Sequence, residues 1–227
     1  MEEHEYGDEH KKFVQILLSR RVVSEKEAVE TIRRLKRDEK ADVEKFRKQI
    51  NQTLTTAARL EVRRAWCEAN TEFVWGIANT VCDEVSKMAS YHAGNDANLL
   101  SNVISACMTS PDGKCSKSHL RTLAPEKMTQ VAAEAAWDAF VTEGWLISVG
   151  GRDDVTVGPR SLIDLKPVLE REEAHLPRCL ICEDIALLAD HCPNERCSVR
   201  LHTKCATDLF RRTERKCPTC KQPWQRR

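Results

Sequence analysis

The chain has 227 residues, of which 41% are hydrophobic and 31% charged, a composition typical of globular proteins. It contains no run of about 18 apolar residues, which excludes a membrane-spanning helix, and its acidic amino terminus does not resemble a secretory signal peptide. We therefore expect a soluble protein, with no membrane contact, in a reducing compartment. Four cysteines are then expected to be core residues or free thiols: Cys67, Cys82, Cys107 and Cys115.

The net charge is +1, but the charges are unevenly distributed. Residues 177–227 hold 11 Lys/Arg against 6 Asp/Glu, whereas the rest of the chain is slightly acidic. A basic segment suits acidic partners, and an ordinary solvated surface explains it equally well. Residues 1–8 are expected to form a flexible acidic tail.

Three helices and a hairpin are expected over 9–78. The apolar positions of the helices recur at helical spacing: Phe13, Ile16 and Leu17; Ala28, Val29, Ile32 and Leu35; Val43, Phe46, Ile50 and Leu54. Ser24 and Glu27 form a capping-box pattern at the start of the second helix. Two segments rich in β-forming residues follow, at 60–66 and 72–77. This order of elements is typical of a winged helix.

The same order repeats over 95–159, after a linking helix predicted over 79–94 whose pattern begins at Ile77. Apolar positions mark its first and third helices: Leu99, Leu100, Val103, Ile104 and Cys107; Ala133, Ala136, Trp137 and Phe140. A short helix around 118–123 and strands at 145–149 and 155–157 complete a second winged helix. A helical stalk over 160–176, kinked at Pro167, then leads to the last segment.

The third helix of a winged helix that reads DNA presents basic or amide side chains. In the second unit this helix has no Lys or Arg between 129 and 143 and carries Glu134, Asp138 and Glu143. These acidic residues would repel phosphate. We therefore predict a protein-docking unit, and an inert spacer is the alternative.

The third helix of the first unit is more basic. It carries Lys45, Arg47, Lys48, Asn51 and Gln52. The three basic residues, Lys45, Arg47 and Lys48, predict a contact with DNA phosphates. Acidic residues at 42 and 44 lie among them, so a mixed-charge solvated face is the alternative.

The last segment holds eight thiol or imidazole groups in four pairs: Cys179 and Cys182, Cys192 and Cys197, His202 and Cys205, Cys217 and Cys220. Zinc binds four such ligands in tetrahedral geometry, and a Cys-x2-Cys turn directs two sulfurs at one ion. We therefore predict two structural Zn2+ sites rather than disulfides. His191 is an alternative ligand to Cys192. Spacing alone leaves open whether the pairs are used in sequence or interleave.

The residues beside the ligands favour a RING variant over a PHD finger. A PHD finger usually has an aromatic residue where this chain has Arg215, whereas Pro218 follows the seventh ligand as in RING domains. The resemblance implies that Ile181, Pro218 and Leu209, or Phe210 in its place, bind a ubiquitin-conjugating enzyme. It also implies interleaved pairing, with Cys179, Cys182, His202 and Cys205 on zinc 1 and Cys192, Cys197, Cys217 and Cys220 on zinc 2.

No residue is expected to act as a nucleophile, because closed tetrahedral sites leave no open coordination position. A RING ligase works by proximity, holding a charged conjugating enzyme near a substrate lysine. Many RING domains contact ubiquitin through an arginine directly after the last ligand. This chain has Lys221 there, which offers an ammonium without the planar guanidinium fork.

We therefore predict an α+β protein with two tandem winged-helix domains and a RING-like zinc domain over 177–227. This organisation resembles the RING-bearing first non-SMC elements of the five/six structural-maintenance-of-chromosomes (SMC) complex. The most specific matching segments are 199–205, 216–220 with Trp224, and 140–147. The Cys192-x4-Cys197 spacing is wider than in that family and predicts a longer loop at the second zinc.

The resemblance implies a nuclear, chromosome-associated subunit that docks a MAGE-type protein through its winged helices and assembles with a kleisin subunit and SMC proteins. It also implies a role in DNA repair by homologous recombination, and RING-type E3 ubiquitin ligase activity that the MAGE partner stimulates. Two alternatives remain: a non-catalytic, zinc-braced scaffold and a DNA-binding subunit of the same complex.

Overall fold

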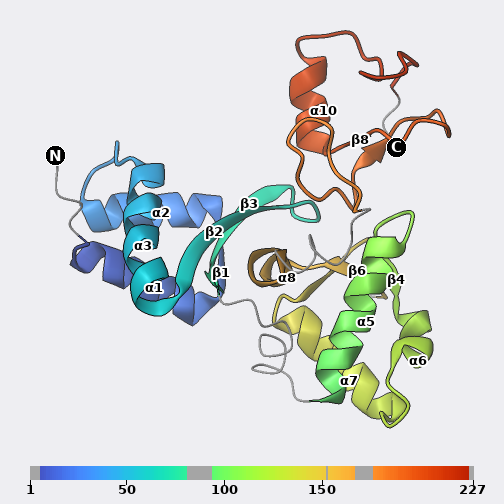
Figure 1. The fold of residues 1–227 in the computed structure, drawn as a ribbon, viewed down its shortest axis with the longest axis horizontal. Coiled ribbons are helices and arrows are strands. Elements are labelled where there is room, and N and C mark those ends of the chain that lie inside the picture. Colours follow the sequence, from blue (N-terminus) through green and yellow to red (C-terminus); the bar gives the residue numbers. More distant parts are fainter. Residues whose placement is uncertain (1–5, 81–93, 152, 167–175, 225–227) are drawn as a thin grey trace.

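The computed structural model describes residues 6–80, 94–151, 153–166 and 176–224 of the chain. Two of its three regions are built from helices and a small antiparallel sheet, and the third is mostly loop (Figure 1). Helices and short antiparallel strands together form the α+β class that the sequence predicts. No helix in these ranges is both long and apolar enough to cross a lipid bilayer.

The first region is a winged helix. Its elements are α1 (Asp8–Arg20), β1 (Val22–Ser24), α2 (Glu25–Lys36), α3 (Val43–Ala58), β2 (Leu60–Cys67) and β3 (Glu72–Asn79). Ser24 and Asp42 cap α2 and α3, because each side-chain oxygen accepts a hydrogen bond from an amide in the first turn. The apolar faces of the helices meet the sheet around Phe13, Ile50 and Trp75, which are fully buried.

Two details of this region differ from the prediction. Strand β1 joins the sheet in the order β1-β3-β2, and its three residues are too few for an alternating pattern to be recognised. Strand β3 continues to Asn79, which pairs with Leu60. The prediction that a linking helix begins at Ile77 is therefore wrong. Ile77 pairs with Val62 in the sheet and packs against the core of the first winged helix. Residues 81–93 of that predicted helix lie outside the described residues.

The second region repeats the winged-helix order. Its elements are α5 (Asn95–Thr109), β4 (Cys115–Ser116), α6 (Leu120–Leu123), α7 (Gln130–Thr142), β5 (Leu146–Ser148) and β6 (Asp154–Val157). A 3-10 turn over Lys117–His119 precedes α6. The short helix predicted around 118–123 therefore consists of a 3-10 turn followed by one α-helical turn. Strand β4, which was not predicted, is the edge of the sheet order β4-β6-β5. Trp137, Phe140 and Trp145 fill the core.

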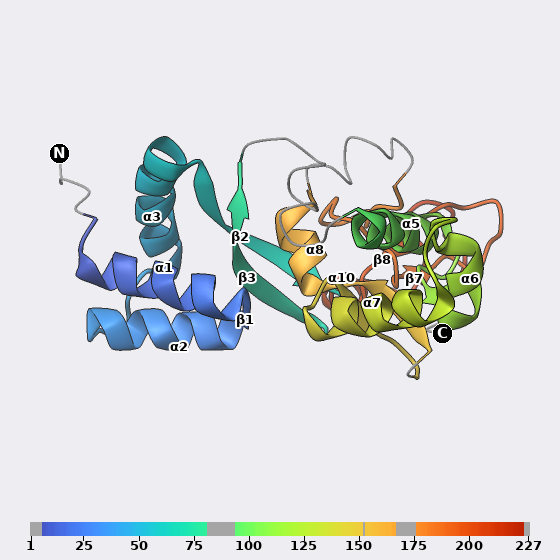
Figure 2. The ribbon, with the colours of Figure 1, turned by 90° about the horizontal axis from the view of Figure 1, so that it is seen from below.

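Helix α8 (Pro159–Asp164) joins the two winged helices. Its Ile163 is 1% exposed and packs with Ala65 and Val74 on the face of the β2–β3 hairpin turned away from α1 and α3. Arg63 donates a hydrogen bond of 3.1 Å to the carbonyl of Ile163. Figure 2 shows α8 between the hairpin and α7. The predicted kink at Pro167 lies outside the described residues.

The third region contains little regular structure. Strand β7 (Asp190–His191) pairs with β8 (Arg200–Leu201), and α10 (Thr203–Phe210) follows. Its buried cluster has nine members, three of which are cysteines: Cys179, Ala186, Ala189, Cys192, Val199, Leu201, Ala206, Cys217 and Trp224. A core this small cannot by itself order a segment of this length, so additional cross-links are required.

His10 is buried in the first winged helix and stacks on Phe46, with 4.2 Å between the ring centroids. Its Nδ1 accepts a 3.0 Å hydrogen bond from the amide of Gly7, and its Nε2 lies 3.3 Å from Oε1 of Gln49. These contacts suit a neutral ring that carries its proton on Nε2. Burial lowers the pKa of His10 below its usual value, against the opposing effects of Gln49 and Glu9.

The depressed pKa of His10 predicts a loss of stability in acid. The contribution of the neutral ring is complete above the unfolded pKa of about 6.5 and is lost as the pH falls through the folded pKa. We predict that lowering the pH from about 7.5 to about 5.5 reduces the unfolding free energy less in His10→Gln than in the unmodified protein. Denaturant titration measures both values, and equal losses in the two proteins would contradict the prediction.

Candidate metal centres

The first candidate centre brings together Cys179, Cys182, His202 and Cys205. Their ligand atoms all lie within 4.8 Å of one another. His202 directly precedes α10, and Cys205 lies in its first turn. The Nδ1 atom of His202 is 3.2 Å from Sγ of Cys182 and 3.9 Å from Sγ of Cys205. Nδ1 is therefore the ring nitrogen that faces the sulfurs.

The second candidate centre brings together Cys192, Cys197, Cys217 and Cys220, again with all ligand atoms within 4.8 Å. Sγ of Cys192 is 3.4 Å from Sγ of Cys220, and Sγ of Cys197 is 3.8 Å from Sγ of Cys217. The two centres interleave along the chain. The second group contains Cys192, and His191 belongs to neither group found among the described residues.

The spacing of the sulfurs fits a tetrahedral metal ion such as zinc. Zn–S bonds of about 2.3 Å at tetrahedral angles place two sulfurs about 3.8 Å apart, close to the distances of 3.4 and 3.8 Å in the second centre. A disulfide requires about 2.05 Å. The cysteines that the structure describes are all free thiols.

The four thiols of the second centre lie too close together to ionise independently. Burial, together with hydrogen bonds from the neighbouring thiols, raises the pKa of Cys192 to about 12. The backbone amide of Gln222 instead lowers the pKa of Cys220 to about 6. Four adjacent thiols cannot all ionise without a counter-charge, whereas a divalent ion binds the thiolate form. The residues present therefore fit a metal ion.

Glu68, which sequence patterns did not single out, approaches the first centre. This residue lies in the β2–β3 turn, yet its Oε1 is 3.5 Å from Nε2 of His202. Burial raises the pKa of Glu68, while the amides of Leu188 and Leu187 and the nearby His202 act in the opposite direction. No local motif could have identified it, because the contact joins residues more than a hundred positions apart.

Ile181 of the predicted enzyme-binding surface lies beside a second exposed aliphatic side chain, which was not predicted. Ile181 is 49% exposed and its neighbour Leu180 is 47% exposed, in the turn that also carries Cys179 and Cys182. Pro218 and Leu209 are only partly accessible, and Leu209 and Phe210 pack against the small core. This turn is therefore the most accessible apolar part of the predicted surface.

Lys221, the predicted ubiquitin contact, lies in a left-handed backbone conformation with φ of 63°. Its Nζ donates a 2.7 Å hydrogen bond to the carbonyl of Pro218. The ammonium group therefore binds back to the Cys217–Cys220 turn that directly precedes it.

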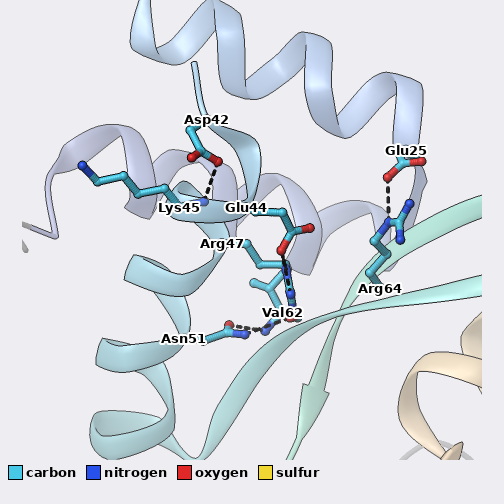
Figure 3. A network of polar contacts seen from close by, with 8 residues as sticks. All are labelled: Glu25, Asp42, Glu44, Lys45, Arg47, Asn51, Val62 and Arg64. Atoms are coloured by element: carbon cyan, nitrogen blue, oxygen red, sulfur yellow. Dashed lines mark hydrogen bonds and ion pairs between the residues drawn. The ribbon is translucent and has the colours of Figure 1, made fainter. Parts of the chain in front are cut away.

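The basic third helix of the first unit uses Arg47, one of its three predicted phosphate contacts, and Asn51 within the fold (Figure 3). Arg47 donates to Oε2 of Glu44 at 2.8 and 3.1 Å and to the carbonyl of Val62 at 3.4 Å. Asn51 donates to that carbonyl at 3.0 Å and accepts from the amide of Val62 at 2.7 Å. Both anchor α3 to β2. The side chain of Lys45 extends away from this network.

The third helix of the second unit, α7, exposes an apolar and acidic face. Val131 is 78% exposed, and Ala132, Glu134 and Ala135 are exposed beside it. Asp138 accepts a hydrogen bond of 3.0 Å from Lys117. This face suits contact with a protein more than contact with phosphate.

The fold and the ligand clusters define the class: a tandem winged-helix protein with a carboxyl-terminal RING-like domain. Residues 179–220 match the family model described as "RING-like domain", and residues 10–115 match that described as "Nse1 non-SMC component of SMC5-6 complex". Over these residues the chain is therefore similar to the Nse1 family.

Relatives and one solved structure are similar to this chain over nearly its whole length. Proteins named "Non-structural maintenance of chromosomes element 1 homolog" from Rattus norvegicus and Homo sapiens are 26% and 25% identical over 96% of this chain and 84% of their own length. A chain in the solved structure of an "Nse1-Nse3-Nse4 complex" has 22% identity and a TM-score of 0.81, covering 98% of this chain and 99% of that chain. This structural similarity shows a common fold.

Removing the metal is predicted to unfold the RING-like domain alone. Its small core depends on the two ligand clusters, whereas each winged helix has an apolar core of its own. We predict that a zinc chelator abolishes amide-exchange protection at 190–220 and preserves it in α1 to α3. Cys182→Ser should behave like the chelated protein. Cys115→Ala, which removes a thiol from the second winged helix, should keep protection at 190–220; chelated protein that stays protected there would contradict the prediction.

Proposed function

We propose that this chain is a RING-type E3 ubiquitin ligase subunit of an SMC5-6 complex, with one Zn2+ held by Cys179, Cys182, His202 and Cys205 and a second by Cys192, Cys197, Cys217 and Cys220. The observation that carries the proposal is the exposed Leu180–Ile181 pair on a turn fixed by two of these ligands. RING domains use an apolar residue at this position to bind a ubiquitin-conjugating enzyme. The match of 179–220 to a RING-like domain supports the assignment.

The proposed activity requires positioning only. Bound zinc supplies a structural cross-link and performs no step of the transfer. The protein holds a charged conjugating enzyme against Ile181 and Pro218, close to a substrate lysine, so that a bimolecular reaction becomes local. Lys221 donates a hydrogen bond to the carbonyl of Pro218. It must leave that carbonyl before it can contact ubiquitin.

The proposed partners are a MAGE-type (Nse3) subunit, a kleisin (Nse4) subunit and the SMC proteins. The similar solved structure is a complex of Nse1 with Nse3 and Nse4, which supports the first two partners. The apolar, acidic outer face of α7 around Val131 suits a protein partner. The similarity of residues 10–115 to the Nse1 family supports a chromosome-associated, nuclear role in DNA repair by homologous recombination.

Loss of the exposed apolar surface is predicted to lower ligase activity strongly. In Ile181→Ala combined with Pro218→Ala, ubiquitin-chain formation with the MAGE-type partner and a panel of conjugating enzymes should fall roughly tenfold or more, because apolar anchors dominate such interfaces. Leu18→Ala is the matched control, since Leu18 is 47% exposed on α1. Activity equal to that of the unmodified protein would show that the enzyme binds elsewhere.

The scaffold alternative differs from the ligase proposal in its expected results. It predicts no ubiquitin transfer with any conjugating enzyme, whether or not the partner is present, and loss of partner binding in Cys179→Ser. The bond from Lys221 to Pro218 is the observation that favours it.

Direct DNA binding is the second candidate function, favoured by the exposed Lys45 and Lys48 on α3. Arg47 should be left intact in a test, since its bonds hold α3 to β2. If these lysines contact phosphates, Lys45→Glu with Lys48→Glu weakens duplex binding and lowers its salt slope by about 2. Lys12→Glu with Lys127→Glu makes the same charge change elsewhere and should bind normally; equal slopes in both double variants would exclude this contact.

A further inference from the structure

The turn of the β2–β3 hairpin lies against the RING-like domain (Figure 1). Glu68 follows the last residue of β2, and its Oε2 accepts hydrogen bonds from the amides of Leu187 at 2.6 Å and Leu188 at 3.0 Å. A carboxylate that accepts two backbone amides makes strong, charge-assisted bonds. The first winged helix therefore fixes the segment that precedes β7.

The second oxygen of the same carboxylate faces a candidate metal ligand. Oε1 of Glu68 is shielded from solvent and lies 3.5 Å from Nε2 of His202. That nitrogen also lies 2.9 Å from the carbonyl of Ile185. Since Nδ1 faces the sulfurs, Nε2 carries the ring proton in a metal-binding neutral imidazole. The carbonyl of Ile185 is its direct acceptor, and the charge of Glu68 lies beside this bond.

Aromatic side chains of the hairpin also hold the start of α10. The ring centroid of Trp66 is 6.3 Å from that of His202. Nζ of Lys204 lies 5.4 Å from the centroid of Trp66 and 4.8 Å from that of Phe73, distances at which a cation is attracted to an aromatic face. The hairpin thus contacts both a ligand and the helix that carries the next one.

The second winged helix closes the opposite side of the segment 185–188. Ile185 and Leu187 are buried with its core residues. Gly113, with φ of +71°, approaches so closely that a Cβ there would lie 2.4 Å from the carbonyl oxygen of Leu187. Between Glu68, Leu162 and Leu187 the remaining cavity is about 10 Å3, hardly enough for one water. The segment is held tightly between both winged helices.

We propose that Glu68 is a positioning residue for the first metal centre, so that the first winged helix controls how firmly His202 holds its metal. This inference rests on the proposed metal binding at that centre. A hydrogen-bonded partner at the second nitrogen of a ligand histidine fixes the ring and increases its basicity. Here the direct partner is the carbonyl of Ile185. Glu68, which comes from another domain, places its charge beside that bond and holds the neighbouring amides of Leu187 and Leu188. Movement of the hairpin away from the RING-like domain removes the charge beside Nε2 and frees two amides.

Glu68→Gln tests the role of the charge, because glutamine has the same shape and still offers an acceptor. We expect the variant to retain two zinc ions per chain but to transfer one of them to a chelator about tenfold faster, with the other unchanged. The cobalt-loaded variant should show a shifted visible absorption band, which reports the ligand geometry directly. Glu72→Gln is the control, since Glu72 lies on the same hairpin, opposite Cys67, and takes part in none of these contacts.

Glu68→Ala allows a second measurement, which reports the hydrogen bonds that Glu68 accepts from the amides of Leu187 and Leu188. Hydrogen exchange at Leu187 and Leu188 should be faster in this variant than in the unmodified, metal-loaded protein. If the unmodified chain binds no zinc, the proposed metal binding fails. If it binds two, and Glu68→Gln shows normal release and an unshifted cobalt spectrum, the positioning role is overturned while metal binding stands. Unchanged exchange in Glu68→Ala would likewise overturn it.

Discussion

The arrangement of the three regions depends on the contacts of one hairpin, β2–β3. One of its faces closes the core of the first winged helix through Val62 and Trp75. The other face packs on Ile163 of α8, which leads from the second winged helix. Its turn binds the RING-like domain through Glu68. The hairpin is thus in contact with all three regions, on both faces and at its turn.

The two clusters of candidate metal ligands are the second constraint. The RING-like domain has a nine-residue buried cluster that includes three cysteines of the candidate metal centres, so these centres form part of its small core. Ions that bind these thiolates would contribute directly to folding. This explains how a short, loop-rich segment presents Leu180 and Ile181 outward without burying them.

Features that depend on neighbouring residues could be predicted from the sequence. Helix periodicity identified α1, α2, α3, α5 and α7, and ligand spacing identified eight residues that the structure gathers in two groups. Features that depend on distant contacts could not. Strands β1 and β4 have three and two residues and exist only through pairing with β3 and β6. The structural use of Asn51 and the approach of Glu68 to His202 have no local signature either.

The most direct test of this account is a crystal structure of the zinc-loaded chain with anomalous scattering recorded at the zinc edge. The account predicts two peaks, one among Cys179, Cys182, His202 and Cys205 and the other among Cys192, Cys197, Cys217 and Cys220. It also predicts Glu68 against the amides of Leu187 and Leu188. Peaks that group Cys179 and Cys182 with Cys192 and Cys197, or a hairpin separated from the RING-like domain, would contradict it.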